Sequence, residues 1–288
     1  MTAFVKMHGC GNDFVVLRHA DLEALALGPE ALRTCVRRLC DRNFGIGADG
    51  VLSYDAASNT HLRMRYWNRD GSRAEMCGNG ARCVVRLAWE RGEIVPELTL
   101  ETDAGTHAVK VQRASSEAPW VEIDMGPVRW DAGAIGLSQH AELLDAPLRV
   151  GDGTLRVTAC SVGNPHAIVF VADRAALAAV DLATTGKALA EHVAFRHGTN
   201  ASFVAADAGA LHSRVFERGV GPTLACGSAA CAALAAAVRH QLLPALTAAV
   251  HLPGGTVEVR QDADAHLWLR GPATIVAEGR LAAELLSS

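Results

Sequence analysis

The sequence is short of the features that mark several protein classes. It contains only 2 Tyr and 7 Phe, so a basic surface interleaved with base-stacking aromatic rings is not indicated. Its 27 basic residues are balanced by 31 acidic ones, which leaves no field that would hold a polyanion. The one dense basic run, residues 33–42, is interpreted as the solvent-facing side of a helix. We therefore expect no nucleic-acid partner.

Long apolar runs are also missing. The most apolar helix-like stretch, residues 224–238, is shorter than the roughly 20 residues that cross a bilayer, and Arg239 and His240 close it. The first residues show no positively charged start followed by an apolar core, so no signal peptide is indicated. We expect a cytoplasmic protein without a membrane partner.

The 8 cysteines contain no C-x-x-C motif, the spacing that is typical of zinc ribbons and of thioredoxin-type redox sites. Neighbouring cysteines, such as Cys77 and Cys83, are instead spaced so that a helix would scatter their thiols. Thiols of a cytoplasmic chain stay mostly reduced. The sequence therefore predicts no metal site and no disulfide framework.

What the chain does contain is a repeat. Its 288 residues are enough for two domains. Short motifs recur in the same order at a nearly constant offset: 11–16 with 163–169, 47–49 with 198–200, 66–69 with 215–218, 77–79 with 226–228, 105–106 with 255–256, and 126–127 with 271–272. We predict two copies of one domain, 1–126 and 127–272, related by a pseudo-twofold axis. The C-terminal strand, 273–288, is expected to pack on the first copy.

The local patterns mix strands with a few helices. Alternating or β-rich runs predict strands at 107–112, 120–125, 256–261 and 266–271. Apolar residues at helical spacing follow Cys77 and Cys226, and these helices are expected to end at Gly92 and before Pro244. A further helix is predicted over 22–40. The absence of strict β-α-β alternation predicts the α+β class, with a mainly antiparallel sheet in each domain.

Cys77 and Cys226 each stand just before a predicted helix, in C-G-N-G-A and C-G-S-A-A. The start of a helix exposes unpaired N–H groups and the positive end of the helix dipole. It lowers the pKa of a thiol from about 8.5 and binds carboxylates. The glycine after each cysteine lets a ligand approach the backbone, and Asn79 and Ser228 provide a cap or a direct contact.

Inversion of an amino-acid α-carbon needs this arrangement twice. A base must remove the α-hydrogen from one face while an acid delivers a proton to the other. The charge that develops on the substrate carboxylate is stabilised by helix N-termini aimed at it. Two equivalent cysteines on opposite sides of a cleft between the domains, one thiolate and one thiol, would meet both needs. Cys77 and Cys226 are therefore the predicted acid–base pair.

The motifs resemble the diaminopimelate epimerase family. The matching blocks run in family order: K-M-H-G-C-G-N-D-F (6–14), G-I-G-A-D-G (45–50), W-N-R-D-G-S-R-A-E-M-C-G-N-G-A-R-C (67–83), G-N-P-H (163–166), G-T-N (198–200) and E-R-G-V-G-P-T-L-A-C-G-S-A-A (217–230). The resemblance implies a cofactor-independent isomerase that interconverts LL- and meso-2,6-diaminopimelate in lysine and cell-wall precursor biosynthesis. It also implies a homodimer, and domains whose sheets wrap around a central helix with the active site in the interdomain cleft.

The resemblance also assigns roles within the site. It implies that His166 and Glu217 tune the two catalytic thiols. The residues implied to hold the substrate are Asn12, Asn68, Asn164, Asn200, Glu217 and Arg218, with the backbones of Gly78, Asn79, Gly227 and Ser228 taking the reacting carboxylate. A guanidinium fork such as that of Arg218 suits a carboxylate. One departure stands out, because many members of the family carry Gln at the position of Gly50.

Other functions stay open at this point. The G-x-G-x-x-G run at 45–50 matches a dinucleotide fingerprint but lacks the preceding strand and following helix that such a site needs. A proline or hydroxyproline racemase would share the two cysteines. A non-catalytic amino-acid-binding module would bind without exchanging the α-hydrogen, and a thiol redox protein would use the cysteines as a disulfide.

Overall fold

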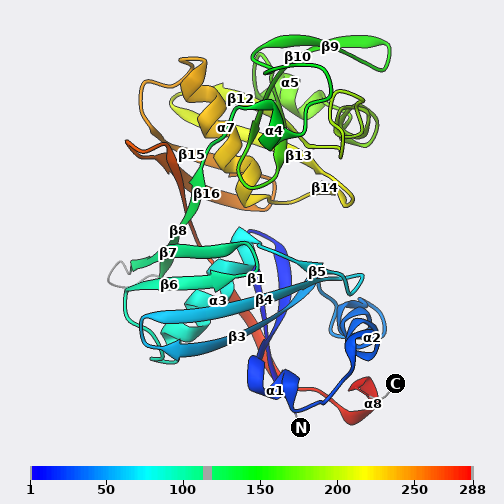
Figure 1. The fold of residues 1–288 in the computed structure, drawn as a ribbon, viewed down its shortest axis with the longest axis vertical. Helices are drawn as coiled ribbons and strands as arrows, with labels where there is room; N and C mark the ends of the chain where they lie inside the picture. Colours follow the sequence, from blue (N-terminus) through cyan, green and yellow to red (C-terminus); the bar gives the residue numbers. More distant parts are fainter. Residues whose placement is uncertain (1, 113–118, 287–288) are drawn as a thin grey trace. The chain divides into compact units, whose positions relative to one another are not determined.

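The computed structural model describes residues 2–112 and 119–286. Residues 1, 113–118 and 287–288, which belong to the predicted first copy and C-terminal strand, lie outside the described residues. The chain forms two compact units, drawn in Figure 1. Unit 1 comprises Met1–Ile123 with Gly271–Ser288, and unit 2 comprises Asp124–Arg270.

Unit 1 is built from β1 (Ala3–Gly9), β2 (Asn12–Arg18), β3 (Gly50–Ser58), β4 (His61–Asn68), β5 (Arg73–Ala74), β6 (Glu97–Thr102), β7 (Gly105–Gln112), the start of β8 (Trp120–Pro127) and β18 (Thr274–Arg280). In its described part, the β2–β3 and β4–β6 pairs are parallel and the other registered pairs are antiparallel. The late strand β18 pairs with the first strand, β1.

Unit 2 is built from β9 (Ala146–Val150), β10 (Gly153–Ser161), β11 (Pro165–Phe170), β12 (Asn200–Asp207), β13 (Ala210–Glu217), β14 (Gly221–Thr223), β15 (Thr247–Leu252), β16 (Gly255–Gln261) and β17 (His266–Gly271). From β10 to β17 the pairings follow the same order as those from β1 to β8, with β11–β12 and β13–β15 parallel. The predicted α+β class with mainly antiparallel sheet is confirmed.

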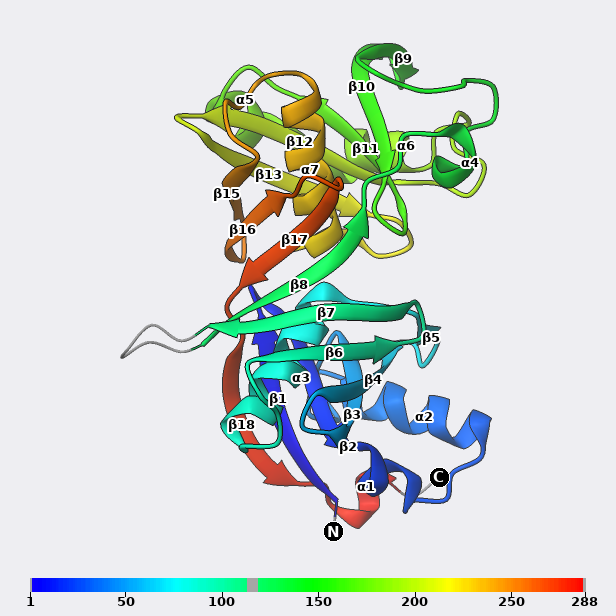
Figure 2. The ribbon, with the colours of Figure 1, turned by 60° about the vertical axis from the view of Figure 1, so that its left-hand side comes forward.

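One helix lies at the centre of each unit. In unit 1, α3 (Gly78–Glu90) contacts β1, β2, β3, β4, β7 and β18, and Figure 2 shows these strands curving around it. In unit 2, α7 (Gly227–Arg239) contacts β10 to β13, β15 and β16. Small residues allow this close packing, since a Cβ at Gly80 would lie 3.0 Å from a methyl of Leu52. The sheets therefore wrap around the two helices that follow the cysteines.

The predicted ends of these helices hold. α3 stops at Glu90, and Gly92 beyond it has a φ of +69°, which a glycine adopts without strain. α7 stops at Arg239, before Pro244. The four predicted strands lie within β7, β8, β16 and β17.

The predicted helix over 22–40 is wrong as a single element. The chain forms α1 (His19–Glu23) and α2 (Pro29–Cys40), with a break between them. Ala26 has a φ of +50°, which no helix accommodates, and α2 restarts after Gly28 with Pro29 in its first turn. Proline lacks the N–H that a helix interior needs but fits the first turn, so Pro29 begins a helix rather than continuing one.

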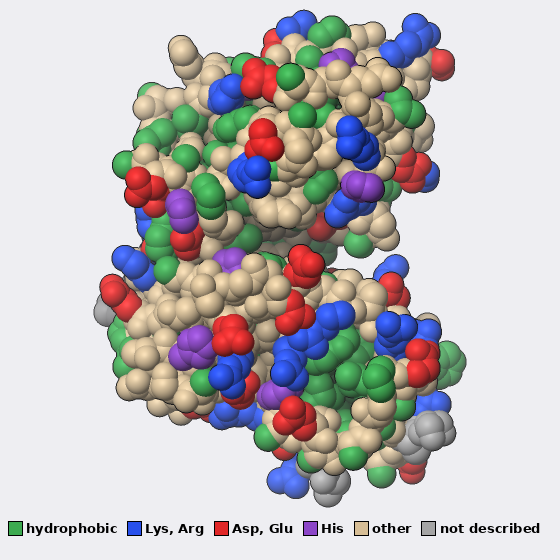
Figure 3. Space-filling view, in the orientation of Figure 1, with side chains coloured by type: hydrophobic (Ala, Val, Ile, Leu, Met, Phe, Trp, Pro, Cys, Tyr) green, Lys and Arg blue, Asp and Glu red, His purple; other side chains and the backbone are tan. Residues whose placement is uncertain are grey.

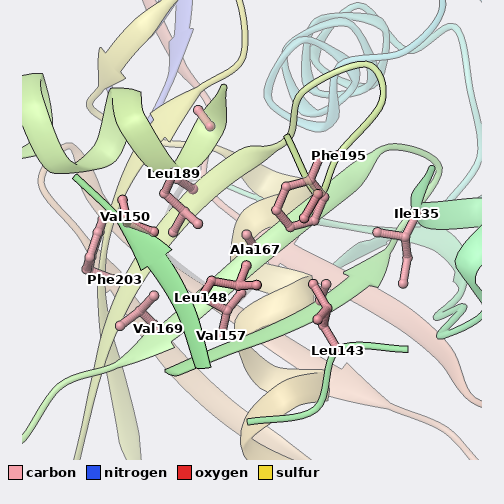
Figure 4. Packing of buried hydrophobic residues seen from close by; sticks show 14 of the residues in the cluster. Ile135, Leu143, Leu148, Val150, Val157, Ala167, Val169, Leu189, Phe195 and Phe203 are labelled. Atoms are coloured by element: carbon pink, nitrogen blue, oxygen red, sulfur yellow. The ribbon is translucent and has the colours of Figure 1, made fainter. Parts of the chain in front are cut away.

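The remaining helices are short: α4 (Ala132–Ile135), α5 (Arg174–Ala179), η1 (Leu182–Gly186, a π-helix turn), α6 (Lys187–Ala190) and α8 (Ala283–Leu286). In unit 2 they cover a second core, where Val157, Ala167 and Phe203 from the strands meet Leu189 and Phe195 (Figure 4). This core packs the sheet on the face away from α7 and holds its strands in register.

No helix within residues 2–112 and 119–286 combines the length and the apolar character that crossing a bilayer requires. Figure 3 shows both acidic and basic side chains on the face that it views, with several basic side chains adjoining one another in its lower half and acidic ones beside them.

Candidate active site

The sulfur of Cys77 stands at the beginning of α3. Cys77 is the N-cap residue in extended conformation, and its Sγ accepts a hydrogen bond from the Gly80 amide at 3.5 Å. The side chain is half-buried. The sulfur therefore lies where the unpaired amides of the first turn and the positive end of the helix dipole favour negative charge.

Two of the predicted asparagines join Cys77 in one network. The Cys77 thiol donates to Asn12 Oδ1 over 3.7 Å, and Asn79 Nδ2 donates to the same oxygen over 3.2 Å. Asn12 Nδ2 in turn donates to Asp49 Oδ2 at 2.9 Å. Asn12 is thus held against the thiol by its neighbours, and both ends of its amide are occupied.

Asn68 lies at the end of β4, and its side chain bonds to a residue outside this network. Its Nδ2 donates to Ser72 Oγ at 3.0 Å, and its backbone pairs with Gly50 on β3. A Cβ at Gly50 would lie 2.5 Å from both the Tyr66 ring and the Trp67 carbonyl oxygen. The space that a side chain at position 50 would enter is therefore filled by Tyr66.

In unit 2, Cys226 is the N-cap residue of α7 and is 6% exposed. Burial raises the pKa of its thiol well above the usual value, and the Glu217 carboxylate raises it further through its charge and a hydrogen bond. The Ser228 hydroxyl, 3.5 Å away, and the Ala229 amide lower the pKa but are outweighed. Cys226 therefore holds its proton firmly in this arrangement.

Glu217 and Arg218, at the end of β13, are both anchored. Glu217 accepts a hydrogen bond of 2.5 Å from the Thr223 hydroxyl on β14. The Arg218 amide donates to Asn200 Oδ1 at 2.9 Å, and its guanidinium donates to the His197 carbonyl at 2.9 Å. The exposed Arg218 side chain is held over the backbone, which leaves further N–H groups to point toward solvent or a ligand.

His166 is fully buried beside Asn164. Its Nε2 lies 2.9 Å from Asn164 Oδ1, and its Nδ1 is buried with no hydrogen-bond partner among the described residues. Burial, followed by the charge of Arg218, lowers the pKa of His166 to about 3. The imidazole is therefore neutral at physiological pH.

The predicted site residues thus divide between two half-sites. Unit 1 supplies Asn12, Asn68, Cys77, Gly78 and Asn79, and unit 2 supplies Asn164, His166, Asn200, Glu217, Arg218, Cys226, Gly227 and Ser228. The asparagines, His166, Glu217 and Arg218 lie at or next to the ends of strands, except Asn79, which lies with the cysteines and their neighbours at the beginning of the two central helices.

The strand registers correct one detail of the motif alignment. Phe14 pairs with Gly50 in unit 1, and His166 pairs with Asn200 in unit 2. Asn200 therefore corresponds to Gly50 and not to Asp49, as the alignment of 47–49 with 198–200 predicted. Asp49 instead precedes the strand and binds Asn12.

The sequence reasoning missed three residues that support the site: Asp49, Thr223 and Arg82. Asp49 and Thr223 lie inside matching motif blocks, so their place in those blocks was the available signal. Arg82 is 0% exposed, inside α3. Its signal was an arginine among the small and apolar residues of that helix, where the second copy carries Cys231. Among the described residues, no three His, Cys, Asp or Glu side chains are grouped closely enough to hold a metal ion.

Solved structures share this fold at low sequence identity. A phenazine biosynthesis protein of the PhzF family from Bacillus anthracis superposes with a TM-score of 0.70 at 17% identity, covering 98% of this chain and 99% of its own. A probable proline racemase from Agrobacterium radiobacter K84 gives a TM-score of 0.69 at 18% identity, covering 98% of this chain and 93% of its own. These likenesses establish the fold alone.

Sequence relatives are more specific. Diaminopimelate epimerase from Thermosynechococcus vestitus is 40% identical over 294 residues, which cover 97% of this chain and 99% of the relative. Diaminopimelate epimerase from Pelotomaculum thermopropionicum is 36% identical over 279 residues, covering 96% and 97%. The family model described as Diaminopimelate epimerase matches residues 4–130 and 158–276. The resemblance found in the motifs is confirmed: the chain belongs to the diaminopimelate epimerase family of isomerases.

Proposed function

We propose that this enzyme interconverts LL- and meso-2,6-diaminopimelate without a cofactor, using Cys77 and Cys226 as base and acid at the α-carbon. The reaction would serve lysine and cell-wall precursor biosynthesis. The observation that carries the proposal is that each unit places a cysteine as the N-cap of its central helix. Family membership supplies the substrate.

The proposed step moves one proton to the enzyme and one back. In one direction the Cys77 thiolate removes the α-hydrogen while the Cys226 thiol protonates the opposite face, and in the other direction the roles exchange. The electron pair that the C–H bond leaves behind spreads into the α-carboxylate. The first-turn amides at Gly78–Asn79 and Gly227–Ser228 would stabilise that charge as it develops.

The surroundings of the two thiols support this division of roles. Burial and Glu217 favour the protonated form of Cys226, whereas Cys77 is half-buried and receives an amide hydrogen bond. We propose that Glu217 tunes Cys226 through its charge. The buried His166 can act only as a neutral group, so its proposed tuning role is to shape and desolvate the site.

The remaining site residues would hold the substrate. We propose that Asn68, Asn164 and Asn200 bind the polar groups at its far end, together with Glu217 and Arg218. The Arg218 guanidinium suits the second carboxylate. Asn12 is already held by Asp49 and Asn79, so its proposed role is both to touch substrate and to orient the Cys77 thiol. With Gly50 and Tyr66 in place, no side chain at position 50 takes part.

The test is proton NMR of the reduced enzyme with LL-diaminopimelate in D2O, without added cofactor or metal. The proposal expects deuterium to enter the α-position as the meso isomer appears. Each of Cys77→Ala and Cys226→Ala should lower turnover by at least about 10²-fold, since a single general acid or base contributes about 10²–10⁴. Their folds are checked by circular dichroism.

Other outcomes would point elsewhere. Exchange with proline but not with diaminopimelate would keep the two-thiol chemistry and change the substrate. Binding of diaminopimelate without α-hydrogen exchange would indicate a binding module. Full activity after the two thiols are oxidised would contradict the mechanism.

We further propose a cytoplasmic homodimer without nucleic-acid or membrane partners. Reduced thiols are needed at both half-sites, which suits a reducing compartment. Size-exclusion chromatography with light scattering measures the oligomeric state, and a single monomer mass at micromolar concentration would contradict the dimer.

A further inference from the structure

Arg82 is a fully buried arginine close to the Cys77 half-site. It lies on α3 and its side chain is 0% exposed. Its Nε donates to the Pro272 carbonyl at 3.1 Å and its Nη1 to the Gly78 carbonyl at 3.2 Å. Its Nη2 donates to Asn79 Oδ1 at 2.8 Å and lies 3.9 Å from Cys10 Sγ. The three oxygen acceptors, two backbone carbonyls and one side-chain amide, are neutral.

Burying a guanidinium among neutral acceptors costs desolvation free energy. A buried cation is normally matched by a carboxylate, because neutral acceptors repay only part of its lost hydration. Among the described residues, Arg82 has no ion-pair partner in contact. The backbone also makes room for the group: a Cβ at Gly9 would lie 3.0 Å from Arg82 Nη2 and 3.1 Å from the Asn79 carbonyl oxygen. A buried charge without a counter-ion in contact indicates that its electrostatic effect on neighbouring groups has a role.

The hydrogen bonds of Arg82 also fix how the side-chain amides of Asn79 and Asn12 are oriented. A guanidinium can only donate, so Asn79 must turn its Oδ1 toward Arg82 and its Nδ2 toward Asn12. Asn12 then accepts with Oδ1 and donates with Nδ2 to Asp49, which can only accept. The result is that Asn12 presents its oxygen to the Cys77 thiol.

That oxygen favours the protonated thiol, because a carbonyl oxygen accepts a hydrogen bond from a thiol but repels a thiolate. For Cys77 to act as a base near neutral pH, its thiol must first lose its proton, so other groups must stabilise the thiolate. The Gly80 amide stabilises the thiolate by a hydrogen bond. The positive charge of Arg82, which is linked to Cys77 through Asn79 and Asn12, also stabilises it.

We propose that Arg82 is a positioning residue for Cys77, which orients the Asn79–Asn12 pair and whose charge keeps the thiolate form accessible. The role rests on the proposed function only in so far as Cys77 is the base. The second copy offers a natural contrast, since Cys231 and Ser228 stand where Arg82 and Asn79 stand in the first. Beside Cys226 the nearby charge is the negative one of Glu217, and its pKa is raised.

The experiment compares Arg82→Gln, which keeps a donor and removes the charge, with Arg82→Lys, which keeps the charge. The rate at which iodoacetamide alkylates each cysteine is measured against pH by peptide mass spectrometry, without substrate. In Arg82→Gln we expect alkylation of Cys77 near pH 7 to fall about tenfold, because less thiolate is present, with Cys226 changed less than about twofold. In Arg82→Lys, Cys77 should stay within about threefold of the wild type.

The matched control is Arg86→Gln, one turn farther along α3, where the guanidinium donates to the Ala273 carbonyl and its Nε lies 3.7 Å from a Glu90 oxygen. It removes the same charge from the same helix and should leave the Cys77 profile unchanged. An unaltered Cys77 profile in folded Arg82→Gln would overturn the proposal. If that variant does not fold, Arg82→Lys decides, because a tenfold fall there would show that charge is not what matters.

The steady-state kinetics of the same variants are measured separately. In Arg82→Gln we expect kcat to fall about 10²-fold in both directions, with KM changed less than about threefold. A shift of the Cys77 profile in an enzyme whose wild type exchanges no α-hydrogen would sink the proposed function and leave the role of Arg82 standing. An unshifted profile in an active epimerase would do the reverse.

Discussion

The two half-sites begin from the same plan and differ in their charges. Each is a cysteine that caps a central helix of thirteen residues, beside the ends of equivalent strands. Near Cys77 the charge is the fully buried guanidinium of Arg82, and near Cys226 it is the partly buried carboxylate of Glu217. In the proposed mechanism the first charge favours loss of a proton from Cys77, and the second favours retention of the proton on Cys226.

The difference bears on the proposed mechanism, in which two copies of one domain supply unlike groups, a base from one copy and an acid from the other. A helix N-terminus is equally available to both cysteines and therefore cannot decide which is the base. Single positions decide it, because a charge in a water-poor site acts on its neighbours far more strongly than in water. The following predictions exchange or remove such positions, from the largest expected effect to the smallest.

Cys231→Arg would place a guanidinium at the position in α7 that corresponds to Arg82. Cys231 is 0% exposed, and unit 2 has Ser228 in place of Asn79 to receive the charge. We expect a loss of at least about 4 kcal/mol of unfolding free energy, or no folded protein, because the buried charge is unpaired. Urea denaturation followed by circular dichroism measures it.

The control for size is Cys231→Met, which is long but uncharged. It should cost clearly less than the arginine, although overpacking still costs about 1–3 kcal/mol. Equal stability of the two variants would mean that the surroundings of Cys231 accept a cation too, so that those of Arg82 are not specially suited to one.

His166→Phe would give unit 2 the residue that unit 1 carries at Phe14. Burial keeps His166 neutral in the folded state with a pKa of about 3, whereas the unfolded chain takes up a proton near 6.5. Its contribution to stability is therefore complete above about pH 6.5 and is lost as the pH falls toward 3. We expect wild-type unfolding free energy to drop by on the order of 3 kcal/mol more than that of the variant between about pH 6.5 and 4.

Urea denaturation of both proteins across that pH range makes the comparison, and the carboxylates that they share cancel in the difference. Parallel pH dependences would show that His166 is protonated or solvated in the folded enzyme.

Gly50→Ala would begin to restore a side chain where unit 2 has Asn200. The new Cβ would meet the Trp67 carbonyl oxygen and the Tyr66 ring, each at 2.5 Å. We expect a cost of about 2 kcal/mol. Tyr66→Ala in the same chain should relieve only the part due to the ring, because the carbonyl oxygen belongs to the backbone.

Gly153→Ala is the matched control, since a Cβ there would meet nothing closer than 3.9 Å. It should leave the urea midpoint nearly unchanged. A Gly50→Ala protein of wild-type stability would show that β3 and β4 can separate at this point.

Glu217→Gln is the mildest change. It removes the negative charge that raises the pKa of Cys226 but leaves the larger effect of burial. The midpoint of Cys226 alkylation should therefore move to lower pH and stay above the usual thiol range. Glu191→Gln, which removes an exposed carboxylate paired with Lys187, should not move it. An upward shift of the midpoint would contradict the assigned influence of Glu217.

The sequence predicted the two cysteine-capped helices because both signals are local. Apolar spacing after Cys77 and Cys226 and the glycine at position 92 act within a few residues, and the structure places the helices there. Gly28 and Pro29 also signal the break between α1 and α2. The prediction of one helix over 22–40 does not take them into account.

Tertiary effects escaped the sequence for a different reason. The correspondence of Gly50 with Asn200 depends on strand register, which the motifs left uncertain by one residue. Arg82 is unusual among the small and apolar residues of its helix, but no local feature indicates that Gly9, Pro272 and Asn79 enclose it. Residues far apart in the chain decide such burial.

The pairing of β18 with β1 has a consequence for synthesis on the ribosome. Unit 2 is continuous from Asp124 to Arg270, whereas unit 1 combines the start of the chain with residues from Gly271 onward. Unit 2 can therefore complete itself as soon as it emerges, while unit 1 waits with one side of β1 unpaired until the final strand arrives. Arg82 waits too, since the Pro272 carbonyl that it binds belongs to that last segment. The half-site that owes its character to a buried charge is thus the last to be finished.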